Sequence, residues 1–170
     1  MSRDKHIKKL PLTTSAQNIR GILLIFSILL LAFSAIFNSS PSTEVAATEI
    51  SKQYSLEIDS GYVMEIPRRL DINPQNFIIE EFTQSSSRML IWDFTGNNQN
   101  TIEIRVNDEI IEQNYSLSSE VAVFDIPIPS VVTITGVDEE VNYAVKFPER
   151  LYTMFNTVAS NQSNEYQLSR

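Results

Sequence analysis

The stretch TIEIRVNDEI at residues 101–110 carries the pattern that decides the fold class. Its apolar residues Ile102, Ile104 and Val106 alternate with polar or charged ones, and a period of two is that of a β-strand with one buried face. The asparagine and aspartate that follow tolerate the positive φ angles of a tight hairpin turn. This stretch therefore predicts a strand that ends in a hairpin.

Similar β-rich runs recur along the chain after residue 52, each bounded by Gly, Asn, Asp, Ser or Pro. The predicted strands cover residues 54–58, 62–66, 77–82, 89–94, 101–106, 121–126, 131–135 and 141–147. Residues 152–156 and 165–168 are further candidates for strands, with a frayed tail as the alternative for this end. No window here has a helical stripe of useful length. About eight short strands at this spacing predict an all-β fold, an antiparallel β-sandwich or jelly roll.

Two prolines set the place of one segment in this fold. Pro127 and Pro129 have no backbone N–H, so they cannot donate a hydrogen bond within a central strand. Residues 126–130 are therefore predicted to lie at a sheet edge or to cross between two sheets.

The N-terminal part of the chain contains the hydrophobic run GILLIFSILLLAFSAIF at residues 21–37. Residues 1–20 carry five basic and one acidic side chain, a charge of +4, whereas residues 38–170 carry eight and 20, a charge of −12. A helix of this length spans roughly 25 Å, the short end of what crosses a bilayer. Because basic residues stay on the cytoplasmic side, this order predicts a single-pass anchor with the C-terminal domain outside the cell membrane.

Two alternatives to an uncleaved anchor stay open. The run also resembles the core of a secretory signal, and residues 45–47, or less favourably 32–34, fit a cleavage site, in which case the domain is secreted. A pilin-like leader also combines a basic arm, a glycine and a hydrophobic helix. Here, however, Phe26 stands where a pilin carries glutamate, and residues 38–42 interrupt the helix. The absence of cysteine excludes a lipoprotein anchor.

These patterns divide the chain into four parts. They are a cytoplasmic basic arm at residues 1–20, a transmembrane helix or signal segment at 21–37, a linker at 38–52 and an exported β-sandwich domain at 53–168. The linker is predicted from a composition rich in Ser, Thr, Ala and Pro. A short helix over residues 45–52 is compatible with this composition, but nothing in the sequence requires it.

The side chains available in the exported part exclude most enzyme classes. The chain has no cysteine and one histidine, His6, which lies in the basic arm. A Ser-His-Asp triad, a Cys-His pair and a zinc or iron site held by histidine therefore have no place in residues 38–170. Adjacent acidic residues at 80–81, 108–109 and 138–140 are predicted to be solvated surface charges rather than a catalytic pair. We therefore predict no enzymatic activity, no cofactor, and no catalytic or metal-binding residue.

Calcium is the one metal compatible with this composition, because it accepts carboxylate and carbonyl oxygens. Residues 93–100 and 138–140 are the possible sources of ligands. Neither segment has the alternating aspartate spacing of a calcium loop, so no specific site is assigned.

Trp92 is the only tryptophan, and its neighbours favour burial. It alternates with Leu90 and Phe94, so the three side chains are expected on one apolar face inside the fold. The alternative is a sugar-stacking platform, in which Trp92 is exposed together with Tyr143 or Tyr152.

Six short segments form the last feature: IWD at 91–93, RVND at 105–108, IPS at 128–130, TG at 135–136, NYAVKF at 142–147 and NEYQL at 164–168. Together they resemble an uncharacterised group of bacterial membrane-anchored β-domain proteins over residues 50–168. The group carries more glycine near residues 138–140 than this chain does. The resemblance implies no activity. Its structural consequence is a strand at residues 165–168 rather than a tail.

These observations lead to an expectation about function. The chain is expected to be a noncatalytic, membrane-anchored bacterial protein that displays a β-sandwich outside the cell for binding or scaffolding, as an accessory subunit of an envelope complex. Its expected partners are the lipid bilayer, another envelope protein and a polysaccharide. Nucleic acid is not expected, because a sequence pI of about 4.6 provides no basic surface for phosphate. The alternatives are a carbohydrate-binding module with exposed aromatic residues and, less favoured, a pilin-like subunit.

Overall fold

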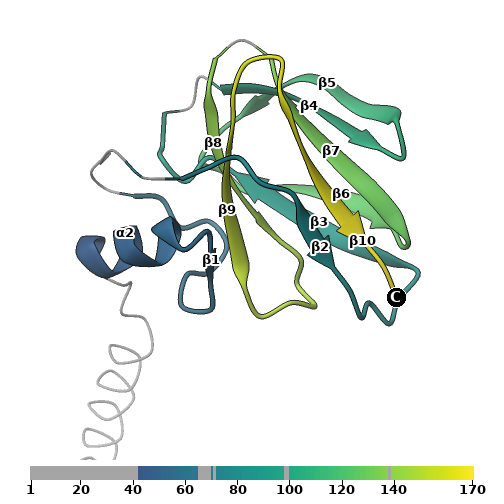
Figure 1. Ribbon diagram of the computed structural model, residues 1–170, viewed down its shortest axis with the longest axis horizontal. Coiled ribbons are helices and arrows are strands. Elements are labelled where there is room, and N and C mark those ends of the chain that lie inside the picture. Colours follow the sequence, from purple (N-terminus) through teal and green to yellow (C-terminus); the bar gives the residue numbers. More distant parts are fainter. Residues whose placement is uncertain (1–41, 65–69, 71, 98–99, 138) are drawn as a thin grey trace, which may run out of the picture. The chain divides into compact units, whose positions relative to one another are not determined.

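The computed structural model describes residues 42–64, 70, 72–97, 100–137 and 139–170. These residues form helix α2 (Thr43–Ser51) and ten β-strands (Figure 1). The strands are β1 (Tyr54–Ser55), β2 (Phe77–Ile79), β3 (Ser86–Trp92), β4 (Asn100–Val106), β5 (Glu109–Leu117), β6 (Ala122–Pro127), β7 (Ser130–Gly136), β8 (Val141–Lys146), β9 (Thr153–Val158) and β10 (Ser163–Leu168).

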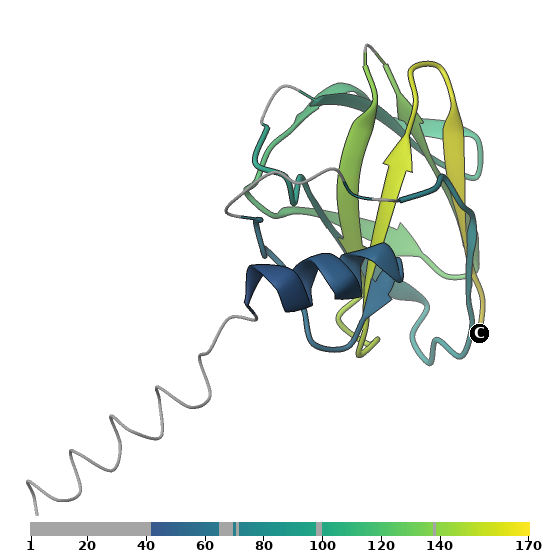
Figure 2. The same cartoon turned by 60° about the vertical axis from the view of Figure 1, so that its left-hand side comes forward.

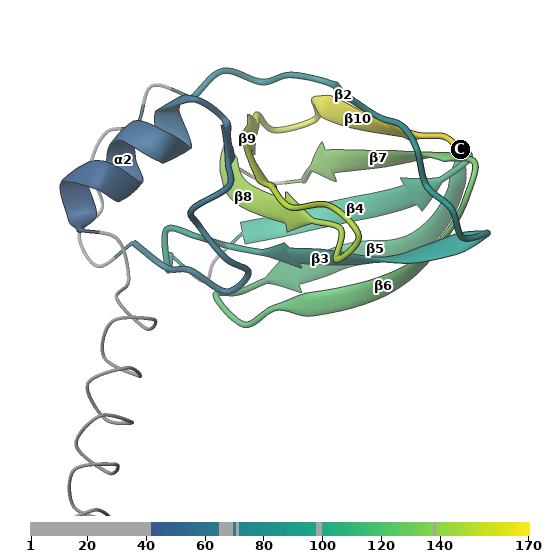
Figure 3. The ribbon, with the colours of Figure 1, turned by 90° about the horizontal axis from the view of Figure 1, so that it is seen from below.

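The strands form two five-stranded sheets that pack as a β-sandwich, which confirms the predicted all-β class (Figure 1 and Figure 3). Sheet A has the order β1-β9-β8-β3-β6, and sheet B has the order β2-β10-β7-β4-β5. Neighbouring strands are antiparallel except for β2 and β10, which are parallel. Each sheet therefore has one very short strand at an edge, β1 in sheet A and β2 in sheet B.

The main core lies between the sheets and is built from the apolar positions of alternating strands. In β4, Ile102, Ile104 and Val106 are buried, while the residues between them are half-buried. Ile104 lies opposite Ile134 of β7, and both residues belong to the main apolar cluster. The alternation at residues 101–106 is thus the burial pattern of an internal strand of sheet B.

The hairpin predicted after residue 106 is present. Asn107 and Asp108 have φ angles of 49° and 67° and join β4 to β5. Strand β5 is not among the strands predicted from the apolar runs of the sequence. It is an edge strand in which Leu117 is the only buried residue, so its sequence has no alternation of apolar and polar positions.

Two predictions about single segments are confirmed. β6 ends at Pro127 at an edge of sheet A, and the chain then crosses to β7 in sheet B, as the two prolines predict. The end of the chain forms β9 and β10 rather than a frayed tail. β10 pairs with β7 on one side and with β2 on the other, so it is an internal strand of sheet B.

Helix α2 lies over the outer face of sheet A (Figure 2), and a second apolar cluster is buried between the helix and the sheet. Ala46 and Ile50 are one helical turn apart, and they pack with Trp92, Phe94 and Phe155. α2 lies beside β9 in all three views. Residues 43–51, which the sequence assigns to a linker, therefore form a packed helix. Burial of its two apolar side chains stabilises this short helix, which has little stability of its own.

Two further strand predictions need correction. Of residues 54–58, only Tyr54–Ser55 is strand, because Ser55 Oγ accepts the N–H of Glu57 at 3.0 Å and the chain turns there. Residues 62–64 contain no strand and form part of the cover over sheet A, where the N–H of Met64 donates to the carbonyl of Phe94 at 2.8 Å. Residues 65–66 of the same prediction lie outside the described residues.

The predicted basic arm and hydrophobic run, residues 1–37, also lie outside the described part of the chain. Among the residues that the structure describes, no helix is long and apolar enough to span a bilayer. The membrane anchor stays a prediction from the sequence.

Candidate functional site

An apolar pocket with a volume of about 340 Å³ lies between the edge strands β1 and β2, at one side of the sandwich. It is lined by Tyr54 of β1, Leu56, Phe77 of β2 and Tyr152. Tyr54 and Leu56 are 60% and 69% exposed, so this wall is open to solvent. Apart from the two tyrosine hydroxyls, the lining side chains are hydrocarbon. The pocket therefore suits an apolar group.

The first wall of the pocket, Tyr54 and Leu56, is held by the turn that follows α2. Gln53 has a φ of 65°, and its carbonyl accepts the N–H of Phe155 at 2.9 Å. β1 then pairs with β9, with Tyr54 opposite Met154. Backbone hydrogen bonds thus fix this wall to sheet A.

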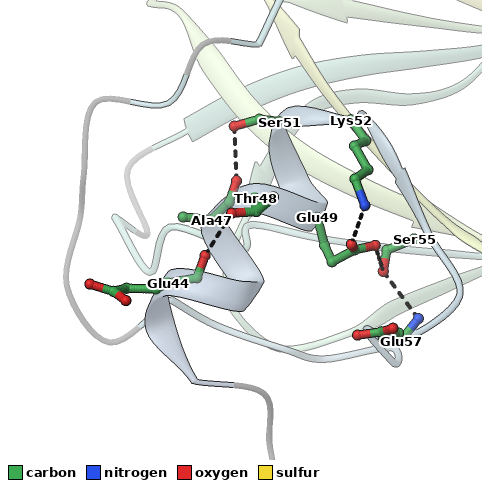
Figure 4. Close-up of polar contacts among 8 residues, drawn as sticks. All are labelled: Glu44, Ala47, Thr48, Glu49, Ser51, Lys52, Ser55 and Glu57. Atoms are coloured by element: carbon green, nitrogen blue, oxygen red, sulfur yellow. Dashed lines mark hydrogen bonds and ion pairs between the residues drawn. The ribbon is translucent and has the colours of Figure 1, made fainter.

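Side chains at the end of α2 brace the same turn (Figure 4). The ammonium group of Lys52 donates to Glu49 at 2.5 Å, and Ser55 Oγ donates to the other oxygen of Glu49 at 3.1 Å. Ser55 Oγ also accepts the N–H of Glu57 at 3.0 Å. The hydrogen bond from Lys52 lowers the pKa of Glu49 and raises the pKa of Lys52. Both groups are therefore charged at neutral pH, and the turn keeps its bracing.

The second wall, Phe77, is supported from behind by Tyr166 of β10. The two rings are stacked, with centroids 5.4 Å apart and an angle of 15° between their planes. The backbone just before β2 is held by hydrogen bonds to a side chain, where a strand of a sheet would bond to its neighbouring strand. Asn156 accepts the N–H of Gln75 at 3.2 Å and donates to the carbonyl of the same residue at 2.8 Å. Phe77 therefore projects from a segment that is fixed on the side of sheet A as well.

A buried polar network lies behind this stack. Asn156 donates to the Tyr166 hydroxyl at 3.1 Å, and that hydroxyl donates to the Tyr143 hydroxyl at 3.2 Å. Asn164 donates to the Tyr143 hydroxyl at 2.9 Å. Burial raises the pKa of Tyr143 to about 12 and raises the pKa of Tyr166 well above its ordinary value. Both tyrosines stay protonated at neutral pH, and the network fixes the ring that supports Phe77.

The third wall, Tyr152, lies in the connection between β8 and β9, and this connection is fastened to the chain that follows β2. The guanidinium of Arg150 lies over the ring of Phe82, 4.5 Å from its centroid, and donates a hydrogen bond to the carbonyl of Glu80. Because Glu80 directly follows β2, the contact ties the third wall to the second. All three walls are held by interactions between the two sheets or within their edges.

The aromatic residues considered for sugar stacking do not gather at one surface. Trp92 and Tyr143 are fully buried, so a stacking platform built on these two residues is wrong. Trp92 lies in the cluster under α2 with its two predicted apolar neighbours, and its indole N–H donates to the carbonyl of Tyr62 at 2.8 Å. Its predicted burial is confirmed. Tyr152 is half-buried and is the one member of this set that lines the pocket.

Asp93, the first residue of the stretch considered for calcium, braces its own loop. Its Oδ1 accepts the N–H and the hydroxyl of Thr95 at 2.7 and 2.6 Å, and its Oδ2 accepts Nδ2 of Asn100 at 3.0 Å. Residues 98–99 and 138 lie outside the described residues. Within the described ranges, no three His, Cys, Asp or Glu side chains are grouped in a way that would hold a metal ion. The carboxylate of Asp93 thus has a structural role in this loop.

The sequence does not identify Tyr54, Leu56 or Phe77 as site residues. In the sequence they are ordinary apolar positions of predicted strands, and such positions are usually buried. Tyr54 and Leu56 are exposed and Phe77 is half-buried, because the sheet order places β1 and β2 at the edges of different sheets. Comparison of the chain with protein-family models, with curated proteins and with solved structures found no match. The case for a function therefore rests on the geometry and charge of the pocket.

Proposed function

We propose that this chain is a noncatalytic, membrane-anchored protein that binds another protein of the bacterial envelope as an accessory subunit of a complex. The observation that carries the proposal is the exposed apolar pocket formed by Tyr54, Leu56, Phe77 and Tyr152. Protein interfaces are commonly anchored by one apolar or aromatic side chain that enters such a pocket. Rigid support of all three walls favours binding, because little conformational entropy is lost when a partner docks.

The noncatalytic part of the proposal rests on side-chain chemistry. Residues 38–170 contain neither histidine nor cysteine. The adjacent acidic residues at 80–81, 108–109 and 139–140 are exposed and lie in separate loops or strand ends. A general acid and base need a shared cleft, which dispersed surface carboxylates do not provide.

The membrane anchor in this proposal comes from the uncharged run at residues 21–37 and from the difference in charge across it. With that anchor, the basic arm is cytoplasmic and the β-sandwich is displayed outside. A cleaved signal gives the same domain in secreted form.

Carbohydrate binding is the second candidate, and one observation favours it. Three of the four pocket residues are aromatic, and sugar rings stack on such side chains. A sugar also needs several hydrogen-bonding groups around its hydroxyls, and the lining offers only the hydroxyls of Tyr54 and Tyr152. Protein binding is therefore the better fit.

The test is capture of a partner from native membranes with the full-length chain in detergent. Leu56→Asp places a charge in the pocket wall, and the 69% exposure of Leu56 means that the fold tolerates it. Val123→Asp is the matched control, because Val123 is 53% exposed on β6, at the opposite edge of sheet A from β1. We expect the wild type and Val123→Asp to retain one stoichiometric protein partner that Leu56→Asp loses.

Two outcomes contradict the proposal. If the wild type and both variants capture the partner equally, the pocket does not take part in binding. Binding of an envelope oligosaccharide in place of a protein, with the same loss in Leu56→Asp, establishes the carbohydrate alternative.

A further inference from the structure

The segments around the pocket carry more negative than positive charge. Together they contain five acidic and two basic side chains, in residues 52–60, 77–82 and 148–152. Both cations are already engaged, since Lys52 pairs with Glu49 and Arg150 lies over Phe82. One of the five acids, Asp59, is paired with Lys146 of β8, so an excess of negative charge remains on the other four. The pocket is therefore apolar at its centre and negative around it.

Glu57 and Glu80 are the carboxylates nearest in the chain to the first and second walls of the pocket. Glu57 follows the lining residue Leu56, and Glu80 follows β2. Both side chains are exposed, and neither is in an ion pair with any other described residue. Lys52 interacts electrostatically with Glu57, but its ammonium group is already hydrogen-bonded to Glu49. A partner that brings positive charge to this surface therefore meets more carboxylates than cations among the described residues.

The open edge of β2 favours an extended polypeptide as the occupant. The N–H of Ser169 donates to the carbonyl of Ile79 at 3.0 Å, so the backbone groups of Ile79 face β10. Alternation along a strand then directs the N–H and C=O of Ile78 away from β10, toward the open edge. The side chain of Ile78 is also 70% exposed. An extended chain satisfies such an edge with its own regularly spaced backbone groups, whereas an acyl chain has no donors or acceptors to offer.

The same charges disfavour other occupants. A second copy of this chain brings another domain with the charge of −12 carried by residues 38–170, and like charges repel. Anionic lipid headgroups meet the same repulsion.

We propose that the pocket binds an extended, basic segment of the partner protein. One apolar side chain of that segment enters between Tyr54 and Phe77, and its lysine or arginine side chains lie against Glu57 and Glu80. This inference rests on the proposed function and specifies the chemistry of the partner.

The first experiment uses three synthetic peptides and the full-length chain in nonionic detergent. The probe is Lys-Lys-Thr-Thr-Phe-Thr-Thr-Lys-Lys, and the matched peptides replace Phe by Ala or every Lys by Glu. Calorimetric titration is expected to give an affinity for the probe about tenfold or more above that for either matched peptide. High salt is expected to weaken binding of the lysine probe, because Glu57 and Glu80 are exposed and their charges are screened by salt.

The second experiment changes the charge of the protein. Glu57→Lys combined with Glu80→Lys is expected to lose the probe and to gain the glutamate peptide. The control is Glu109→Lys combined with Glu112→Lys on β5, at the opposite edge of sheet B from β2, with the same change in net charge. This control is expected to bind the probe as the wild type does.

Three outcomes overturn the inference. They are equal affinity for the lysine and glutamate peptides, no binding of the probe, and a dimer of the chain that Leu56→Asp dissociates. The outcome also separates this inference from the proposed function. If Leu56→Asp abolishes capture of the membrane partner while the lysine double variant retains it, the pocket is a protein-binding site but its ligand is not basic. If neither variant changes capture, the proposed function fails as well.

Discussion

Asn156 is the single residue on which the second wall of the pocket most depends. Its side-chain amide contacts both backbone groups of Gln75, as a neighbouring strand would. It also donates to the Tyr166 hydroxyl and accepts the N–H of Thr157 at 3.0 Å. One buried amide thus connects the chain before β2, the ring behind Phe77 and the strand β9.

Replacing Asn156 by alanine is expected to lower the free energy of unfolding by about 2–4 kcal/mol. The change leaves several buried donors and acceptors without partners, and each such group costs about 1–3 kcal/mol before relaxation. Urea denaturation measures the loss. The control is Gln113→Ala, an exposed amide on the edge strand β5, which is expected to change stability by at most about 0.5 kcal/mol. Equal losses in the two variants contradict the structural role of Asn156.

At the scale of elements, helix α2 is the part of the fold that decides whether sheet A has an open or a covered outer face. Ile50 is fully buried against the cluster that contains Trp92. The same helix ends in the Glu49 and Lys52 contacts that brace the pocket wall at Tyr54. One short helix therefore both covers the outer face of sheet A and supports the first wall of the pocket.

Ile50→Ala is expected to reduce the unfolding free energy by about 2–4 kcal/mol, because it creates a cavity beneath α2. Loosening of the helix exposes the indole of Trp92, so the fluorescence emission maximum is expected to shift to longer wavelength. Val45→Ala tests the same helix at a side chain that is 44% exposed, and its emission is expected to match the wild type. A stable Ile50→Ala protein with unchanged emission shows that α2 does not protect the indole.

At the scale of the whole molecule, cooperative unfolding is linked to pH through Tyr143 and Tyr166. An unfolded tyrosine has a pKa near 10, whereas burial raises the pKa of Tyr143 to about 12 and that of Tyr166 well above its ordinary value. The unfolded chain therefore releases these protons first as pH rises. The stabilisation is complete below about pH 10 and is lost between about pH 10 and 12.

The expected loss from Tyr143 alone is about 2 kcal/mol between about pH 10 and 12, since one pKa unit corresponds to about 1.4 kcal/mol and the loss is complete only above both pKa values. Urea denaturation at a series of alkaline pH values gives the slope, and the absorbance of phenolate reports ionisation in the same samples. Tyr143→Phe with Tyr166→Phe is expected to be less stable at neutral pH but to have a flatter slope. Ionisation of both tyrosines near pH 10 with the fold intact contradicts their burial.

The strands of the sandwich were largely predictable because burial on one face leaves a period of two, as in Ile102, Ile104 and Val106. The edge strand β5 was not, since it buries only Leu117 and has no reason to alternate. A short helix at residues 45–52 is compatible with the sequence but not required by it, because Ala46 and Ile50 are the only buried residues of α2 and form too narrow a stripe to distinguish from a linker. The pocket was not predictable at all. Its residues come from three separate segments, and only the order of strands in the two sheets places these segments together.

The parallel pairing of β2 with β10 also has a consequence for the biogenesis of the protein. Phe77 lies opposite Tyr166 in this pair, although most of the domain separates the two residues along the chain. Contacts between such distant segments form late in folding. A nascent chain that still lacks β10 has no Tyr166 ring to support Phe77, the second wall of the pocket. For the proposed function, this means that only a fully synthesised chain presents the complete pocket to a partner.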